Sequence, residues 1–389
     1  MIRSQSFYAF DPERVPSPCF AIDEVAVRDN LETLHRIQAR TGAKILLALK
    51  AFSTFALAPL IRKYLAGIAA SGLFEARLGR EEFGGEVHTY SAAFAESDLQ
   101  NVLEISDHVI FNSFSQWHRY QGLVRKTLVH KPVLKFGLRI NPCHSEGKVP
   151  LYDPCASGSR LGVPLSEFGR RDLTGLSGLH FHTLCERDFP PLDRTLSAVE
   201  AQFGDWLNQM EWVNFGGGHH ITRSDYQIDD LCDRIIQFQQ KYNVQVYLEP
   251  GEAIAIQTGV LVSEVLDITR NDIDIAILDT SATCHMPDTL EMPYRAEIFG
   301  AGMAQEKAHT YRLGGLTCLA GDVMGDYSFD RPLQIGQRIM FDDMAHYTMV
   351  KTTTFNGTKL PAIAIWNSET DELQIVREFG YEDFKSRLS

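Results

Sequence analysis

The sequence has none of the long apolar runs, basic runs or paired cysteines that mark membrane, nucleic-acid-binding and disulfide-stabilised proteins. No window approaches the roughly 18 apolar residues of a membrane span, and residues 1–15 hold no apolar stretch like that of a signal peptide. The 37 basic and 50 acidic residues give a net charge of −13, without a basic run that could track phosphates. We therefore expect a cytoplasmic protein that binds neither nucleic acid nor a membrane.

The cysteines are odd in number and scattered, and no C-x-x-C pair or zinc-ribbon spacing occurs among them. They are Cys19, Cys143, Cys155, Cys185, Cys232, Cys284 and Cys318. Free thiols in a reducing compartment are the simplest interpretation. Walker A, G-x-G-x-x-G and H-E-x-x-H motifs are also absent, so nothing indicates nucleotide or zinc-protease chemistry. The acidic balance suits a cationic small molecule, although solubility alone also explains it.

Short apolar runs alternate with helical periodicity along the first two thirds of the 389 residues. The eight runs are 44–50, 67–71, 86–91, 108–113, 135–141, 176–182, 210–216 and 244–250. A candidate helix follows Asp23, a residue suited to the N-cap, and ends before Gly42. Eight strands that alternate with helices predict a (β/α)₈ barrel, which we place at residues 20–258.

After Gly259 the pattern changes to strand-like runs separated by hairpin-like gaps. These runs are 259–270, 272–282, 309–318, 338–344, 346–352, 362–367 and 373–379. They predict a second, all-β domain over residues 259–389, and we expect residues 1–19 to pack with it.

Polar residues end several of the eight barrel runs, and the active site of such a barrel lies at the carboxyl ends of its strands. Lys50 ends the first run after apolar neighbours. A desolvated lysine can lose its charge and act as a Schiff-base nucleophile. The alternative is a lysine whose charged end reaches out of the strand into solvent.

The sixth run ends in His180-Phe181-His182, which puts both imidazoles on one side of a strand. Three interpretations stay open on these residues alone. One ring could stack on a planar cofactor, the two could ligate a metal, or both could be hydrogen-bonded interior histidines.

The last two runs end in glycine and in a carboxylate. Gly216, Gly217 and Gly218 follow the seventh run, and their N–H groups could surround a phosphate or simply form a tight turn. Glu249-Pro250-Gly251 ends the eighth run, where Glu249 could bond a protonated ring nitrogen or belong to a surface turn.

Taken together, Lys50, His182, the three glycines and Glu249 supply every part of a pyridoxal 5'-phosphate site. The lysine takes the aldehyde, the histidine takes the ring face, the glycine amides take the phosphate, and the glutamate keeps the ring protonated as an electron sink. We expect this cofactor and no metal.

At these residues the sequence resembles the alanine-racemase-fold pyridoxal-phosphate decarboxylases, the group that contains ornithine and diaminopimelate decarboxylases. The resemblance spans nearly the whole chain. Leu49-Lys50-Ala51 is similar to the cofactor-lysine motif, and Gly251 follows Glu249-Pro250 as in the family's pyridine and phosphate contacts. The loop 315–318 resembles the family's catalytic cysteine loop, and 341–348 resembles the loop whose tyrosine, here Tyr347, reaches the phosphate.

Within that group, the segments 216–222, 249–253 and 281–295 resemble those of carboxynorspermidine/carboxyspermidine decarboxylases. Two departures from the general decarboxylase pattern fit this narrower resemblance. Glu252 stands where arginine is usual, and Leu319 stands where an aspartate usually contacts the substrate amine, with Asp322 nearby as a replacement. The substrate implied is a carboxylated polyamine, and we expect Glu252, Asp288 and Asp322 to bind its amines.

The resemblance also implies a mechanism and an assembly. After loss of CO₂, Cys318 would supply the proton to the α-carbon, although a buried structural thiol is the commoner fate of a cysteine. A homodimer with shared active sites is expected. The rivals are another basic amino-acid decarboxylase such as one acting on diaminopimelate, a racemase with a catalytic tyrosine, a non-catalytic cofactor carrier, and a metal-dependent barrel hydrolase.

Overall fold

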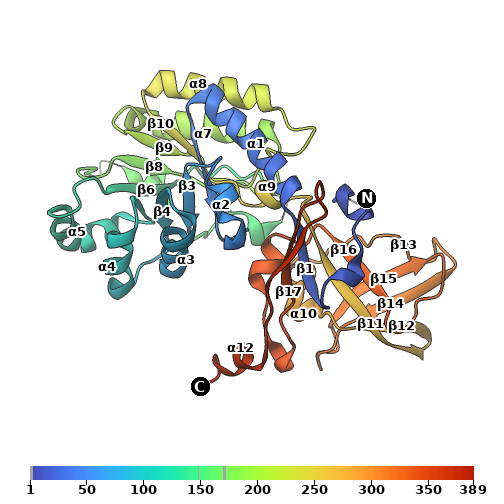
Figure 1. Ribbon diagram of the computed structural model, residues 1–389. Coiled ribbons are helices and arrows are strands. Elements are labelled where there is room, and N and C mark those ends of the chain that lie inside the picture. Colours follow the sequence, from blue (N-terminus) through green and yellow to red (C-terminus); the bar gives the residue numbers. More distant parts are fainter. Residues whose placement is uncertain (1–2, 148, 170–171) are drawn as a thin grey trace. The chain divides into compact units, whose positions relative to one another are not determined.

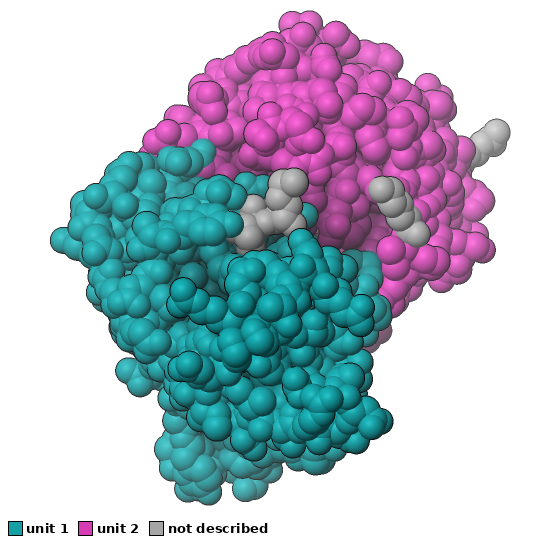
Figure 2. All heavy atoms as spheres, turned by 90° about the vertical axis from the view of Figure 1, so that its right-hand side faces the viewer, with its two compact units in different colours: residues 1–29, 255–389 teal, residues 30–254 magenta. Residues whose placement is uncertain are grey.

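The computed structural model describes residues 3–147, 149–169 and 172–389. The chain forms two compact units, which Figure 2 shows in different colours. We call residues 30–254 the barrel unit, and residues 1–29 with 255–389 the sheet unit.

Eight parallel strands close into a barrel in the barrel unit, with helices outside them (Figure 1). The strands are β2 (Lys44–Ala48), β3 (Gly67–Ala70), β4 (Glu86–Tyr90), β5 (His108–Phe111), β6 (Lys135–Asn141), β8 (Gly178–His180), β9 (Trp212–Asn214) and β10 (Gln245–Leu248). Their order is β5-β4-β3-β2-β10-β9-β8-β6, and pairing of β5 with β6 closes the ring. Each lies within a predicted run, so the predicted barrel is confirmed. A short strand, β7 (Val163–Pro164), adds to β6.

The helices α1 and α5 begin at residues whose side chains accept hydrogen bonds from the first turn. The carboxylate of Asp23 accepts a hydrogen bond from the N–H of Val25 at the start of α1, and Gly42 follows the helix with a φ of +72°. Ser113 caps α5 by accepting from the N–H of Gln116. The helices are α1 (Glu24–Thr41), α2 (Ala58–Ile61), α3 (Leu73–Leu78), α4 (Glu96–Ile105), α5 (Phe114–Leu128), α6 (Leu165–Phe168), α7 (Phe189–Leu207), α8 (Ile228–Tyr242) and α9 (Glu252–Ala255).

The sheet unit contains a second sheet whose central strands are buried. Its order is β13-β15-β14-β12-β11-β1-β17-β18, with β16 also paired to β11. The strands are β1 (Cys19–Asp23), β11 (Gly259–Asn271), β12 (Ile273–Leu278), β13 (Gly302–Met303), β14 (His309–Gly314), β15 (Val323–Phe329), β16 (Arg338–Asp342), β17 (Ala362–Trp366) and β18 (Leu373–Arg377). Short helices α10 (Ala282–His285), α11 (Asp288–Glu291) and α12 (Tyr381–Lys385) make the unit mainly rather than purely β.

Three details differ from the sequence predictions. The barrel unit begins at residue 30 instead of 20, because β1 pairs with β11 and β17. The predicted strand 346–352 is a 3₁₀ helix, Tyr347–Lys351, since the chain turns tightly there and Tyr347 has a φ of +42°. Strand β15 was missed because Gly325 and Asp326 interrupt its apolar pattern.

Among the described residues, no helix is long and apolar enough to cross a membrane.

Candidate active site

Lys50 lies in the turn that follows β2, at the carboxyl ends of the barrel strands. This turn is fixed by backbone hydrogen bonds from Ala48 to Pro250 and from Leu49 to Ala69. The Lys50 side chain keeps contact with solvent, yet protein atoms surround it closely. Desolvation and the Arg139 cation lower the pKa of Lys50, and the anions Glu249 and Glu75 only partly oppose them. A lysine of lowered pKa is suited to carry an aldehyde cofactor.

His182 lies beside Lys50, with its Nε2 atom 3.4 Å from the lysine Nζ. The N–H of Gly217 donates to Nδ1 of the ring at 3.0 Å, so the ring proton of neutral His182 sits on Nε2. Desolvation, Lys50 and Arg139 hold the pKa of His182 well below its usual range. The ring is therefore neutral and fixed in orientation next to Lys50.

Glu249 follows β10, and its two carboxylate oxygens have different partners. Asn214 Nδ2 donates to Oε1 at 2.6 Å, while His180 Nε2 lies 3.3 Å from Oε2. Desolvation raises the pKa of Glu249, but His180 and Asn214 outweigh it and bring the pKa to about 2. Desolvation lowers the pKa of His180, the contact with Glu249 opposes this, and the buried Nδ1 of the ring has no partner among the described residues. Glu249 is thus a permanent anion, as a protonated ring nitrogen requires.

The glycines following β9 let three chain segments approach closely. A Cβ on Gly216 would lie 2.5 Å from the carbonyl oxygen of Phe181, one on Gly217 would lie 2.1 Å from that of Glu249, and one on Gly218 1.9 Å from that of Leu184. Two of their amides are already engaged, since Gly216 donates to Asn214 Oδ1 and Gly217 donates to His182. The triple glycine thus positions His182 and Glu249. The sequence had suggested only that the amides of these glycines surround a phosphate or form a tight turn.

Gly251 and Glu252 extend the site beyond β10. A Cβ on Gly251 would lie 2.5 Å from that of Ala51, the neighbour of Lys50. Glu252 Oε1 lies 3.2 Å from Nε2 of His220, within ion-pair range, although the ring is not aligned for a hydrogen bond. Glu252 thus directly follows Gly251, the residue that packs against the turn holding Lys50.

Sequence reasoning missed two residues of this site. Arg139 on β6 is buried and donates to the carbonyl oxygen of His182, and Asn214 on β9 joins Glu249 to the glycine turn. In the sequence, each of them is visible only as a polar residue within an otherwise apolar strand run.

The predicted residues after position 255 belong to the sheet unit. Cys318 is exposed on the loop after β14, and its N–H donates to Asn356 Oδ1 at 2.8 Å. The buried carboxylate of Asp322 accepts from Ser281 Oγ and from both the N–H and hydroxyl of Thr317. This arrangement favours a role for Asp322 in shaping the cysteine loop over its predicted contact with a substrate amine.

Asp288 and Tyr347 also lie in the sheet unit. Lys351 Nζ lies 2.5 Å from Asp288 Oδ1 and 2.5 Å from Glu291 Oε2, so one shared cation offsets only part of the charge of Asp288. Tyr347 follows the turn at Asp343, whose carboxylate accepts from the N–H of Gln257 at 2.6 Å. Gln257 and Asp343 both have a positive φ, and their contact fixes the loop 341–348 ahead of Tyr347.

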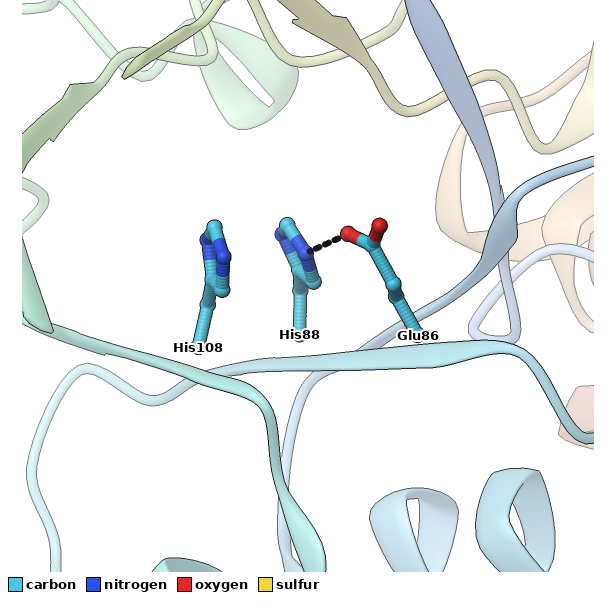
Figure 3. A group of neighbouring side chains, drawn as sticks. All are labelled: Glu86, His88 and His108. Carbon is cyan, nitrogen blue, oxygen red and sulfur yellow. Dashed lines mark hydrogen bonds and ion pairs between the residues drawn. The ribbon is translucent and has the colours of Figure 1, made fainter. Parts of the chain in front are cut away.

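A cluster of Glu86, His88 and His108 has the composition of a metal centre but not its geometry. The cluster lies at the amino ends of β4 and β5, the opposite ends from Lys50. The two imidazoles are stacked 3.9 Å apart with planes 19° from parallel, and Glu86 lies on the far side of His88 (Figure 3). In-plane lone pairs of parallel rings do not converge on one ion, and Lys44 and Tyr247 already bind the Glu86 carboxylate. We interpret the cluster as part of the packed floor of the barrel, at the amino ends of its strands.

The residues around Lys50 fit pyridoxal phosphate by their chemistry. A lysine of lowered pKa, a fixed neutral imidazole and an ionised carboxylate lie at the same ends of the barrel strands. Each is suited to one part of the cofactor: the aldehyde, the ring face and the pyridine nitrogen.

Comparisons with known proteins agree with this site. Residues 7–345 match the family described as "Pyridoxal-dependent decarboxylase, C-terminal sheet domain". A carboxyaminopropylagmatine decarboxylase of Synechocystis is 46% identical, covering 96% of each chain. A carboxynorspermidine/carboxyspermidine decarboxylase of Campylobacter jejuni is 44% identical, covering 96% of this chain and 99% of that protein.

A solved structure extends the likeness to three dimensions. The crystal structure of carboxynorspermidine decarboxylase from Campylobacter jejuni, complexed with norspermidine, is 43% identical and matches with a TM-score of 0.88. The match covers 96% of this chain and all of that one. Both the fold and the family resemblance expected from the sequence are confirmed. The chain belongs to the pyridoxal-dependent decarboxylases.

Proposed function

We propose that the protein uses pyridoxal 5'-phosphate to decarboxylate carboxynorspermidine and carboxyspermidine, yielding norspermidine and spermidine. When bound, the cofactor supplies an aldehyde and a protonated ring that accepts the electrons left by the departing CO₂. The cytoplasmic location expected from the sequence is part of this proposal.

The chain's own residues divide the remaining work. Lys50 would hold the cofactor through its aldehyde, and His182 would cover one face of the ring. Glu249, held ionised by Asn214 and His180, keeps a proton on the ring nitrogen. The thiol of Cys318 gives the α-carbon its proton in place of the carboxylate.

The main support for a polyamine substrate is the carboxylate at position 252. This residue follows Gly251, which packs against Ala51 beside Lys50, and it stands where the general decarboxylase pattern has an arginine. Its carboxylate lies 3.2 Å from Nε2 of His220. A carboxylate about 4 Å from an ammonium gains roughly 4 kcal/mol at an effective dielectric constant of 20, before desolvation is subtracted. That attraction favours a side chain with two amines, and it disfavours diaminopimelate, whose distal carboxylate would meet a like charge.

Carboxyaminopropylagmatine is a second candidate substrate, because the decarboxylase of Synechocystis named for it is 46% identical to this chain. Its distal group is a guanidinium, which a carboxylate also binds, often through two parallel hydrogen bonds. Glu252 alone therefore does not separate the two candidates.

The decisive experiment is CO₂ release from carboxynorspermidine, carboxyspermidine, carboxyaminopropylagmatine, diaminopimelate and ornithine, with Lys50→Ala as the inactive control. We expect the highest kcat/KM on the first two compounds. A preference for carboxyaminopropylagmatine would transfer the assignment to the second candidate, and activity on diaminopimelate or ornithine alone would reject both.

We further propose that the enzyme is a homodimer in which the cysteine loop of one subunit completes the barrel site of the other. The loop exposes Leu316 and Leu319 to the extent of 46% and 45%, on either side of the exposed Cys318. Apolar side chains beside a reactive thiol suit a surface that a second copy covers. Mixing inactive Lys50→Ala and Cys318→Ala subunits should restore part of the activity, whereas a fully active monomer in sedimentation would reject the idea.

A further inference from the structure

Arg139 is a buried cation in the middle of the cofactor site. It lies on β6 and is 5% exposed, and its Nη2 atom donates to the carbonyl oxygen of His182 at 2.9 Å. The guanidinium lies over the ring of Tyr90, 4.7 Å from its centroid. Neither contact supplies a negative charge.

Buried arginines are normally paired with carboxylates, because an unpaired charge is costly to desolvate. Arg234, a half-buried arginine in the same unit, is paired in this way, with Asp193 at 2.8 Å and Glu200 as a second partner. No ion pair joins Arg139 to a carboxylate within residues 3–147, 149–169 and 172–389. Glu249 is the strongest anion near Lys50, and its oxygens are taken by Asn214 and His180.

We infer that Arg139 is a positioning residue that supplies the fixed positive charge of the cofactor site and holds His182 against Lys50. The inference concerns the cofactor site and does not depend on which substrate the enzyme takes.

An arginine does not deprotonate in proteins, so Arg139 keeps its charge. That charge changes the pKa of the neighbouring groups that can lose a proton. The groups facing Lys50 are His182, Glu249, Glu75, Cys185 and Arg139. Arg139 follows desolvation as the largest cause of the lowered pKa of Lys50, and it also lowers those of His182 and His180. A neutral lysine amine is the form that attacks an aldehyde, so the cation prepares Lys50 to bind the cofactor.

The test measures the ionisation of Lys50 in the full-length chain after the cofactor has been removed. Trace labelling with acetic anhydride across the range of about pH 7 to 11, read by mass spectrometry, gives the midpoint for Lys50 relative to the exposed Lys126. Arg139→Met and Arg139→Gln should each raise that midpoint by about one pH unit, the low end of what a neighbouring charge produces. Arg139→Lys keeps a cationic group that can lose part of its charge when buried, so it should raise the midpoint less than Arg139→Gln does.

Two controls separate this role from a structural one. Lys135→Met removes a cation from the same strand, but Lys135 is paired with Glu211 at 2.7 Å, so the Lys50 midpoint should not move. Arg139→Gln removes the charge but retains an amide donor for the carbonyl oxygen of His182. It therefore allows the Lys50 midpoint to be measured even if Arg139→Met does not fold. An unchanged midpoint in Arg139→Gln, or an equal rise in Arg139→Lys, would overturn the inference.

Discussion

Replacing Asn214 with leucine tests whether one amide organises the electron-sink end of the site. Asn214 is fully buried and makes two hydrogen bonds, donating to Glu249 Oε1 at 2.6 Å and accepting from the N–H of Gly216 at 2.8 Å. Leucine has nearly the same size but can do neither. The carboxylate of Glu249 then keeps only His180, and the Gly216 amide loses its acceptor.

The two lost bonds have different expected costs. A hydrogen bond to a charged group contributes about 1.5 to 3 kcal/mol, which corresponds to roughly a ten- to 150-fold change in an equilibrium or rate constant. We expect that loss to appear in cofactor affinity and in kcat/KM, since Glu249 would hold the ring nitrogen less well. The orphaned N–H of Gly216 costs about 1 to 3 kcal/mol more, which should appear as a lower Tm.

A double-mutant cycle with Glu249→Gln isolates the link between the two residues. Cofactor dissociation constants and kcat/KM are measured for wild type, Asn214→Leu, Glu249→Gln and the double variant, with exposed Asn101→Leu as the matched control. The Asn214 substitution should cost at least about 1 kcal/mol less in the Glu249→Gln background, because the charge that its amide stabilises is gone.

Full additivity of the two substitutions would refute this reasoning. So would wild-type cofactor affinity and kcat/KM in Asn214→Leu, because Glu249 would then be held ionised without the amide.

Three further predictions follow from the site and from the barrel floor. Lys50→Ala should lose the visible absorption band of the bound cofactor, and a borohydride-reducible link to another lysine would contradict the assignment. Glu252→Gln should lower kcat/KM for carboxynorspermidine by roughly ten- to a hundredfold with unchanged cofactor absorbance. Asp288→Asn should cost less, because Lys351 already offsets part of the charge of Asp288. Wild-type kinetics in Glu252→Gln would mean that other residues bind the distal amines. Burial lowers the pKa of His108 to about 2 in the folded protein, below the value in the unfolded chain. The folded state therefore loses stability relative to the unfolded state as the pH falls below about 6.5, where the unfolded chain binds a proton at His108 and the folded protein does not. Between about pH 7 and 4.5, the free energy of unfolding of His108→Phe should therefore fall by about 2 kcal/mol less than that of wild type. Denaturant unfolding at each pH measures this difference, and parallel pH profiles of the two proteins would contradict the prediction.

The sequence by itself determined the barrel and indicated the candidate residues of its site. Eight buried parallel strands must be apolar along their length, so they appear as separate runs, and the residue after each run falls at the same end of the barrel. Lys50, His182 and Glu249 were found in this way, because the polar residue that ends an apolar run is visible without any knowledge of its partners.

Only the tertiary structure decided how those residues are held and charged. The role of Arg139 depends on contacts with His182 and Tyr90, which are 43 and 49 residues away in the chain. The amides of Gly216 and Gly217 serve Asn214 and His182, although the glycine triplet reads equally well as a phosphate loop. Strand β1 joins the sheet unit through pairing with β17, about 340 residues later in the chain. Local sequence periodicity reports which residues are buried, but hydrogen-bond partners and local charge are set by residues that meet only in the folded chain.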